Sequence, residues 1–109
     1  MPSPHTELTI VSVASEDVGR LVRLEGELDL ATAPALRARL PEFDDQPLVL
    51  DLGGLIFTDS TGLAILLEER ARRLRRGPAL RIRGATGQTR EMLERTGVLA
   101  LFGGPTSAD

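Results

Sequence analysis

Two hydroxyl side chains follow a carboxylate where a long apolar run of this sequence ends. Asp59, Ser60 and Thr61 separate that run from a second one, which starts after Gly62. The pattern is typical of a buried strand that leads directly into a helix. The first turn of a helix exposes unpaired N–H groups and a partial positive charge, so it attracts phosphate. An ordinary helix cap, with Asp59 as a candidate, is the common role of such residues at a helix start. The alternative is a phosphoacceptor at Ser60, with Thr61 as the competing acceptor.

The elements around this turn alternate between strands and helices. Alternating or short apolar runs predict strands over 8–14, 20–25, 48–52 and 79–83. Helices are predicted after the N-cap Thr32, from Gly62 to the Gly77-Pro78 stop, and over 86–96. A short apolar segment over 98–102 closes the pattern. This order predicts an α/β domain with a mixed sheet.

The helix that follows the turn has one broad apolar face, which we expect to pack on the sheet. At 100° per residue, its members are Leu63, Leu66, Leu67, Ala71 and Leu74. Ile65 falls on the opposite side of the same helix. An apolar residue there has two explanations: it packs under a neighbouring loop, or it anchors a protein interface.

Composition excludes several classes of chemistry. The chain has 109 residues, a net charge of −3, no Cys, no Trp, no Tyr and three Phe. This length suits one domain, and without Cys there are no disulfides or thiolate metal sites. We expect no metal and no cofactor. His5 is the one histidine, which argues against a histidine-activated serine hydrolase. Negative charge and few aromatic residues argue against direct nucleic-acid binding.

Two further classes are disfavoured by what the chain lacks. All thirteen basic residues are Arg, whereas a response-regulator receiver would need a late Lys. The N-terminus lacks the features of a signal peptide, and no apolar run approaches the roughly 20 residues of a membrane span. We therefore expect a cytoplasmic protein without a membrane segment.

Arginines cluster near the end of the predicted second helix. Five fall within 70–76, and Arg81 and Arg83 follow. A solvated helix face is the ordinary explanation, because cations are favourable near a helix C-terminus. The functional alternative is a surface that binds an acidic partner or a nucleic acid.

Two motifs and their spacing resemble the STAS domain, in particular the small bacterial anti-sigma-factor antagonists. The first motif is Gly26-Glu27-Leu28-Asp29 with Thr32-Ala33-Pro34, and the second is Leu50-Asp51-Leu52 followed by Asp59-Ser60-Thr61-Gly62-Leu63. The resemblance spans 8–102. It implies a mixed, mostly parallel sheet of four to five strands with three or four helices, flanked by a flexible N-terminus (1–7) and a loose C-terminal tail (103–109).

The resemblance implies partner switching in place of enzyme activity. In this family the unphosphorylated antagonist binds an anti-sigma factor that is also a serine kinase, and so releases the sigma factor that controls transcription. The kinase phosphorylates the Ser after the motif Asp, here Ser60, and binding is lost. A serine phosphatase resets the cycle. We expect a monomer or weak dimer. The alternative is a STAS scaffolding or regulatory subunit of a stress-sensing assembly.

The partner-binding surface that the resemblance implies is formed by the two motifs and one helix residue. Its expected members are Glu27, Asp29, Thr32, Asp59, Ser60, Thr61, Gly62 and Ile65. Gly62 has no side chain, which would let a kinase approach the backbone closely. The ordinary alternatives are an exposed strand residue at Glu27 and a loop start at Asp29.

Overall fold

Four strands form one sheet in the order β1-β2-β3-β4. The computed structural model describes residues 7–15 and 19–103, and its strands are β1 (Thr9–Ser15), β2 (Gly19–Leu28), β3 (Leu48–Thr58) and β4 (Leu80–Arg83). β1 and β2 are antiparallel, whereas β2–β3 and β3–β4 are parallel. The predicted mixed, mostly parallel sheet is confirmed. The expected flexible N-terminus and C-terminal tail lie outside the described residues, apart from Glu7 and Gly103.

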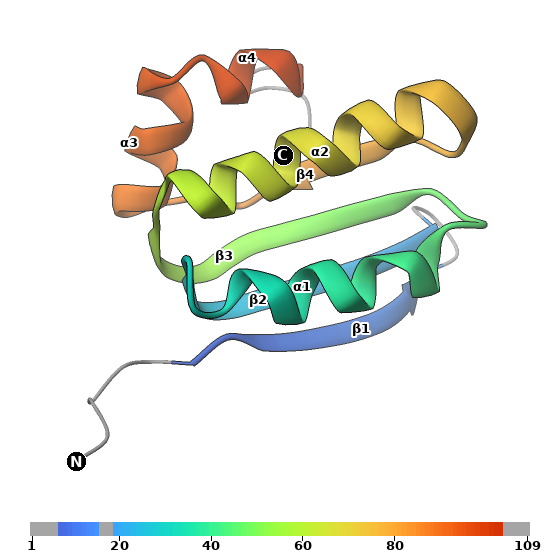
Figure 1. The fold of residues 1–109 in the computed structure, drawn as a ribbon, viewed down its shortest axis with the longest axis horizontal. Helices are drawn as coiled ribbons and strands as arrows, with labels where there is room; N and C mark the ends of the chain where they lie inside the picture. Colours follow the sequence, from blue (N-terminus) through green and yellow to red (C-terminus); the bar gives the residue numbers. More distant parts are fainter. Residues whose placement is uncertain (1–6, 16–18, 104–109) are drawn as a thin grey trace.

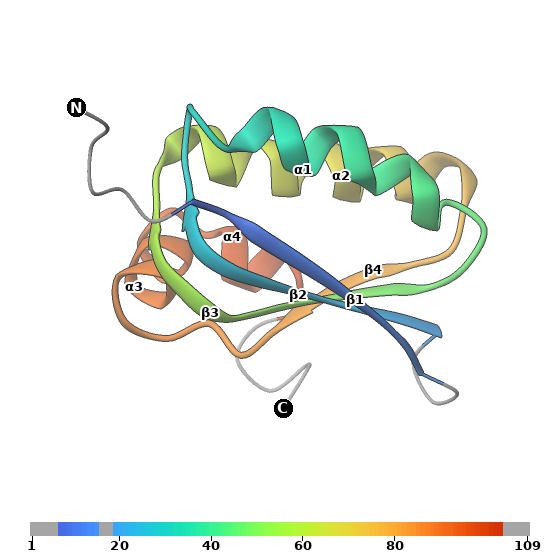
Figure 2. The same cartoon turned by 90° about the horizontal axis from the view of Figure 1, so that it is seen from below.

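The helices cover one face and one edge of this sheet. They are α1 (Ala33–Arg39), the 3₁₀ turn η1 (Leu40–Phe43), α2 (Ser60–Arg76), α3 (Gly87–Arg95) and α4 (Val98–Leu101). α1 and α2 lie side by side on one face, whereas α3 and α4 lie on the side away from β1, with α3 against the C-terminal end of β3 (Figures 1 and 2). The short apolar closing segment is thus a fourth helix. None of the described helices is long and apolar enough to cross a membrane.

The core forms between the inner face of the sheet and the helices α1 and α2. Alternate residues of the central strands point inward and are fully buried, among them Val22, Leu24, Leu50 and Leu52. Leu36 of α1 is also fully buried in this cluster. Burying an aliphatic side chain of this kind stabilises the fold by roughly 1.5–3 kcal/mol, so an aliphatic core suffices without Trp or Tyr.

β2 and β3 are longer than the sequence predicts. We expected them to end at Glu25 and Leu52, but they continue until Leu28 pairs with Thr58. Gly54 permits this continuation, because a Cβ there would lie 2.7 Å from Cγ of Glu25. The two register shifts in this stretch bend the strands without separating them. Gly54 is therefore a place where β2 and β3 approach closely, and not the end of a strand.

The apolar face of α2 is only partly as predicted. Leu63 and Leu66 pack in the core, but Ala71 is exposed and Leu74 is 69% exposed. At the C-terminal end of the helix, Glu69 and Arg73 take the buried positions instead. The prediction failed there because it assigned the sheet-facing side to apolar residues alone.

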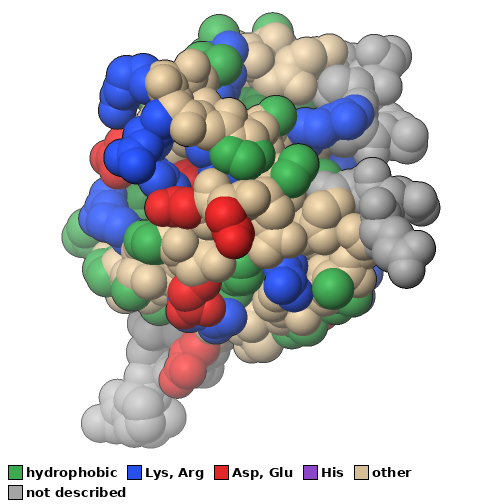
Figure 3. Space-filling model, turned by 90° about the vertical axis from the view of Figure 1, so that its right-hand side faces the viewer, with side chains coloured by type: hydrophobic (Ala, Val, Ile, Leu, Met, Phe, Trp, Pro, Cys, Tyr) green, Lys and Arg blue, Asp and Glu red, His purple; other side chains and the backbone are tan. Residues whose placement is uncertain are grey.

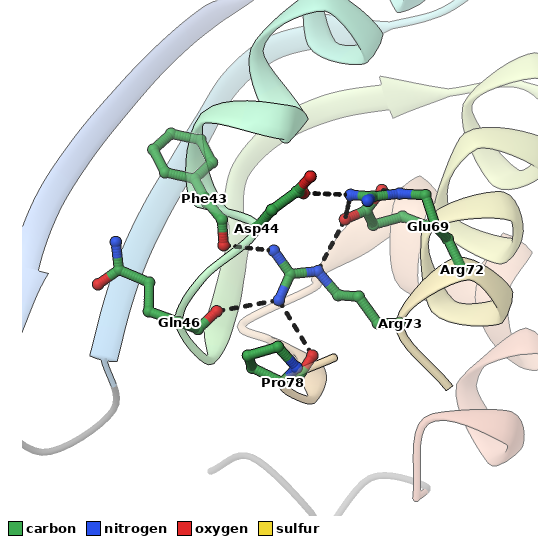
Figure 4. A network of polar contacts seen from close by, with 7 residues as sticks. All are labelled: Phe43, Asp44, Gln46, Glu69, Arg72, Arg73 and Pro78. Atoms are coloured by element: carbon green, nitrogen blue, oxygen red, sulfur yellow. Dashed lines mark hydrogen bonds and ion pairs between the residues drawn. The ribbon is translucent and has the colours of Figure 1, made fainter. Parts of the chain in front are cut away.

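The arginine-rich end of α2 contains a buried polar network. Figure 3, which faces this end of the molecule, shows arginine side chains gathered on its upper part with acidic side chains beside them. Arg73 is 4% exposed, so a solvated helix face is the wrong explanation for it. Its guanidinium contacts Glu69 at 2.7 Å (Figure 4). It also donates to the carbonyl oxygens of Phe43, Gln46 and Pro78, at 2.7, 3.0 and 3.1 Å.

These contacts join α2 to the segments that precede β3 and β4. Arg72 extends the network to Asp44 at 2.6 Å and to Glu69 at 2.7 Å. Its hydrogen bond to Asp44 lowers the pKa of that carboxyl group below the usual value. The network therefore fixes the end of α2 that lies farthest from Ser60.

Candidate functional site

The two sequence motifs meet at the C-terminal ends of two neighbouring strands. Because β2 and β3 are parallel, their C-terminal ends lie together, and Leu28 pairs with Thr58. The N–H of Asp59 donates to the carbonyl oxygen of Leu28 at 3.2 Å. The loop that follows β2 and the turn that starts α2 therefore form one continuous site.

Asp59 joins the two halves of this site through both carboxylate oxygens. Oδ1 accepts a hydrogen bond from the N–H of Gly62 at 3.0 Å, which caps α2. Oδ2 accepts a hydrogen bond from the N–H of Leu30 at 3.2 Å, in the loop between β2 and α1. The capping role expected for Asp59 is confirmed, and its hold on the neighbouring loop is a feature that the sequence does not reveal.

Ser60 is the accessible hydroxyl of the site. It is the first residue of the 17-residue helix α2, and its side chain is exposed. Thr61 is half-buried, and Thr58 is buried with its hydroxyl 3.1 Å from that of Thr89. Among these three hydroxyls, only that of Ser60 combines exposure with a position at the helix N-terminus, where negative charge is stabilised.

The loop between β2 and α1 is held by its own side chains. Oδ1 of Asp29 accepts hydrogen bonds from the N–H groups of Ala31 and Thr32 at 3.0 and 3.1 Å. The hydroxyl of Thr32 donates to the carbonyl oxygen of Glu27 at 2.8 Å and accepts from the N–H of Asp29 at 3.0 Å. Thr32 does occupy the N-cap position of α1, but its side chain makes no capping bond. It shapes the loop instead, because its hydroxyl is already engaged there.

Gly62 has a packing role at the start of α2. It is buried, and a Cβ at this position would lie 2.8 Å from the carbonyl oxygen of Leu28 and 2.9 Å from Cγ2 of Thr58. Contacts this short would push the helix away from the ends of the strands. Glycine therefore lets α2 begin directly against β2 and β3.

Ile65 does not lie on the exposed surface, so the expectation of an apolar anchor there is wrong. Its side chain is 1% exposed, and it lines a small cavity of about 190 Å³ together with Leu40 and Pro41. The prediction considered only the sheet as a cover for α2, whereas α1 and the turn after it cover a second side. The ordinary explanation, packing under a neighbouring segment, is the right one.

Leu30 is an exposed apolar residue that the sequence analysis missed. It is 73% exposed and lies in the loop that Asp59 holds against the start of α2. Ile56, near the end of β3, is also largely exposed. A large apolar residue directly after Asp29, in a polar loop, was the available signal. The surface around Ser60 thus has an apolar component, although not the one predicted.

Gln88 fixes the end of β3 from the other side. Its side-chain amide accepts a hydrogen bond from the N–H of Thr58 and donates one to the carbonyl oxygen of Thr58, both at 2.9 Å. α3 thereby holds the residue that precedes Asp59.

In the described part of the chain, no group of three or more His, Cys, Asp or Glu residues is placed to hold a metal ion.

Replacing Asp59 with alanine is expected to lower the free energy of unfolding by about 1 kcal/mol, because it removes the cap of α2 and the acceptor for the Leu30 N–H. Urea unfolding followed by circular dichroism measures the change. Asp45→Ala is the matched control, since Asp45 is exposed in the segment before β3. If the Asp59→Ala variant were as stable as the wild type, Asp59 would not be the residue that joins the loop after β2 to the start of α2.

Comparison with known proteins identifies the family of this chain. The family model for the Mlab, STAS domain matches residues 11–102. The structure is similar to that of an anti-sigma factor antagonist from Mycobacterium paratuberculosis, with a TM-score of 0.80, 27% identity and coverage of 98% of this chain and 92% of that chain. No curated protein matches the sequence.

Two other solved structures extend the likeness. A STAS domain of an antisigma-factor antagonist from Rhodobacter sphaeroides has a TM-score of 0.58 and 27% identity, and the match covers 72% of this chain and 87% of that one. SLC26A9 has a TM-score of 0.59 at 16% identity, with coverage of 74% of this chain and 16% of that one, and so shares the fold alone. The resemblance indicated by the two motifs is confirmed: the chain belongs to the STAS-domain family.

Proposed function

We propose that this protein is an anti-sigma-factor antagonist of the cytoplasm, without enzyme activity, that is switched by phosphorylation of Ser60. In its unmodified form it binds an anti-sigma factor with serine kinase activity and so releases the sigma factor. A serine phosphatase restores the binding form. The observation that carries this proposal is the exposed Ser60 hydroxyl, at a helix N-terminus and beside the loop that Asp59 holds. The two similar anti-sigma factor antagonists support it.

The charge of a phosphate explains why binding would stop while the fold remains. Phosphoserine carries about −1.5 to −2 charges at neutral pH. The dipole of α2 accommodates that charge, so the helix stays formed. At the surface, however, the new charge adds to those of Asp59 and Asp29, which lie in the same site. A partner that packs against a neutral hydroxyl would then meet a cluster of negative charge without compensation.

Leu30 supplies the apolar contact that such an interface needs. A few well-packed side chains near the centre of an interface contribute most of its binding free energy. Leu30 is tied to Asp59 through its own N–H, so it is held close to Ser60. One partner surface can therefore cover both residues and sense the charge at Ser60 directly.

Isothermal titration of the unmodified protein with a candidate anti-sigma kinase tests the binding step. We expect a complex that forms with the unmodified protein and is lost after incubation with ATP. Light scattering of the protein alone separates the two roles considered for this family. A large, stable assembly that binds no kinase would contradict the antagonist role and indicate a scaffolding subunit.

Replacing Leu30 with aspartate is expected to weaken kinase binding by at least about fivefold, because it removes an apolar contact and adds a charge. The fold should not change, since the side chain is exposed. Leu101→Asp is the matched control: Leu101 is half exposed on α4. If both variants bind like the wild type, Leu30 is not part of the interface.

A further inference from the structure

β1 has a hydrogen-bonded neighbour on one side only. It pairs with β2 along all seven of its residues and forms one edge of the sheet. In the described part of the chain no strand pairs with its other side, and Figure 1 shows β1 at the border of the molecule, beyond α1. Alternate residues of such an edge strand direct their N–H and C=O groups outward. The chemical complement of that row of donors and acceptors is another extended strand.

The sequence of β1 has none of the features that usually block pairing at an open edge. Proteins protect such edges with charged side chains, Pro or a bulge. β1 reads TIVSVAS, without a charge or a Pro, and its register with β2 is regular from end to end. Val11 and Val13 are exposed on it, and β-branched residues favour strand pairing. The edge therefore suits a second strand that is also uncharged.

We propose that β1 pairs with β1 of a second copy of this chain, antiparallel, about a two-fold axis at Ser12. This register uses all seven residues of both strands and places no charged residue in either of them. The two four-stranded sheets then form one continuous sheet. The facing pairs, one residue from each copy, are Thr9–Ser15, Ile10–Ala14, Val11–Val13 and Ser12–Ser12.

The same register continues an apolar row from one copy into the other. Val13 lies beside Leu21, and Leu21 lies beside Val49. These side chains lie on the sheet face away from α1 and α2, because Leu21 and Val49 alternate with core residues of their strands. Val11 of the second copy follows Val13 in this row, and the two-fold axis repeats the contact. Cross-strand pairs of β-branched side chains stabilise such a junction.

The opposite edge of the sheet does not offer an equivalent strand. β4 has only four residues, and two of them are Arg81 and Arg83, so charge and length disfavour pairing between β1 and β4 of different copies. Pairing of β1 with itself closes as a dimer, whereas pairing with β4 would continue without end. The contact is one strand wide, and we expect a dissociation constant on the order of 100 µM.

Sedimentation velocity between about 10 µM and about 1 mM protein tests the proposal without any kinase. The mean mass of the wild type should rise toward that of a dimer. The double variant Val11→Glu/Val13→Glu should self-associate at least about tenfold more weakly, because it places like charges opposite each other. Leu74→Glu/Leu101→Glu is the matched control: both leucines are at least half exposed, on α2 and α4. It should associate like the wild type.

Mixing two charge variants separates pairing of β1 from a general effect of charge. Val11→Lys/Val13→Lys should also be monomeric alone, but an equimolar mixture with Val11→Glu/Val13→Glu should associate at least as well as the wild type, because opposite charges then face each other. Circular dichroism verifies that all variants are folded. A wild type that stays monomeric at every concentration overturns the proposal, as does a mixture that associates no better than its components.

Single cysteines identify the register, since the chain has no Cys of its own. Ser12→Cys alone, or Val11→Cys mixed with Val13→Cys, brings two thiols opposite each other at the Cα spacing of about 4.5–5.5 Å that a disulfide accepts. At least one of these two tests should give a covalent dimer about fivefold faster than the control Leu74→Cys. If neither does, the register is wrong and the proposal falls. These measurements use the protein alone, so they can fail while the antagonist function stands.

Discussion

Replacing Arg73 with methionine is expected to lower the free energy of unfolding by about 3 kcal/mol. The substitution keeps an unbranched apolar stem but removes the guanidinium that donates to Phe43, Gln46 and Pro78. Their carbonyl oxygens would lose this buried donor, and Glu69 would keep only Arg72 as its partner. For a domain whose total stability is about 5–15 kcal/mol, a loss of this size is large. Urea unfolding followed by circular dichroism measures it.

Arg75→Met is the matched control for that substitution. Arg75 lies two residues later on the same helix, and its side chain is exposed. We expect its stability to change by no more than about 0.5 kcal/mol. If both variants lose the same stability, the effect comes from helix propensity or net charge. The buried network would then not be what fixes the end of α2.

Replacing Ser60 with aspartate is expected to weaken binding to the anti-sigma kinase by more than about tenfold, or about 1.4 kcal/mol. The carboxylate places a negative charge beside Asp59 and Asp29, which lie in the same site. The fold should be retained, because an acidic residue in the first turn of α2 is favoured by the helix dipole. Calorimetric titration measures the binding, and far-UV circular dichroism measures the fold.

Ser60→Ala separates the loss of the hydroxyl from the gain of charge. This variant should bind the kinase like the unmodified protein and keep that affinity after incubation with ATP. Unfolding of the Ser60→Asp variant would instead mean that the site is structural. Equal binding of the two variants would mean that charge at this position does not control the partner.

The order of the elements and the turn at Asp59 could be predicted because they depend on local signals. Apolar alternation identifies strands, and an acidic residue before a helix identifies its cap. The Asp59–Gly62 hydrogen bond agrees with that prediction. The two motifs lie close together in space because each follows the C-terminal end of a strand, and the C-terminal ends of parallel strands lie at the same end of the sheet.

Residues governed by contacts between elements could not be predicted in the same way. Ile65 was placed outside because the sequence does not show that α1 lies beside α2. The burial of Arg73 could not be predicted, because its partners are backbone carbonyls, which every residue has. Its one side-chain signal was Glu69, four residues earlier. Leu30 was missed because its position depends on a bond to Asp59, 29 residues away.

The central claim is that Ser60 accepts the phosphate. Mass spectrometry of the protein, after incubation with an active anti-sigma kinase and ATP, tests this most directly. We predict one added phosphate per chain, located by fragmentation on Ser60 and absent from the Ser60→Ala variant. A phosphate on Thr61 in place of Ser60 would contradict the account. The account would also be contradicted if this protein stayed unmodified while the same kinase phosphorylated another antagonist.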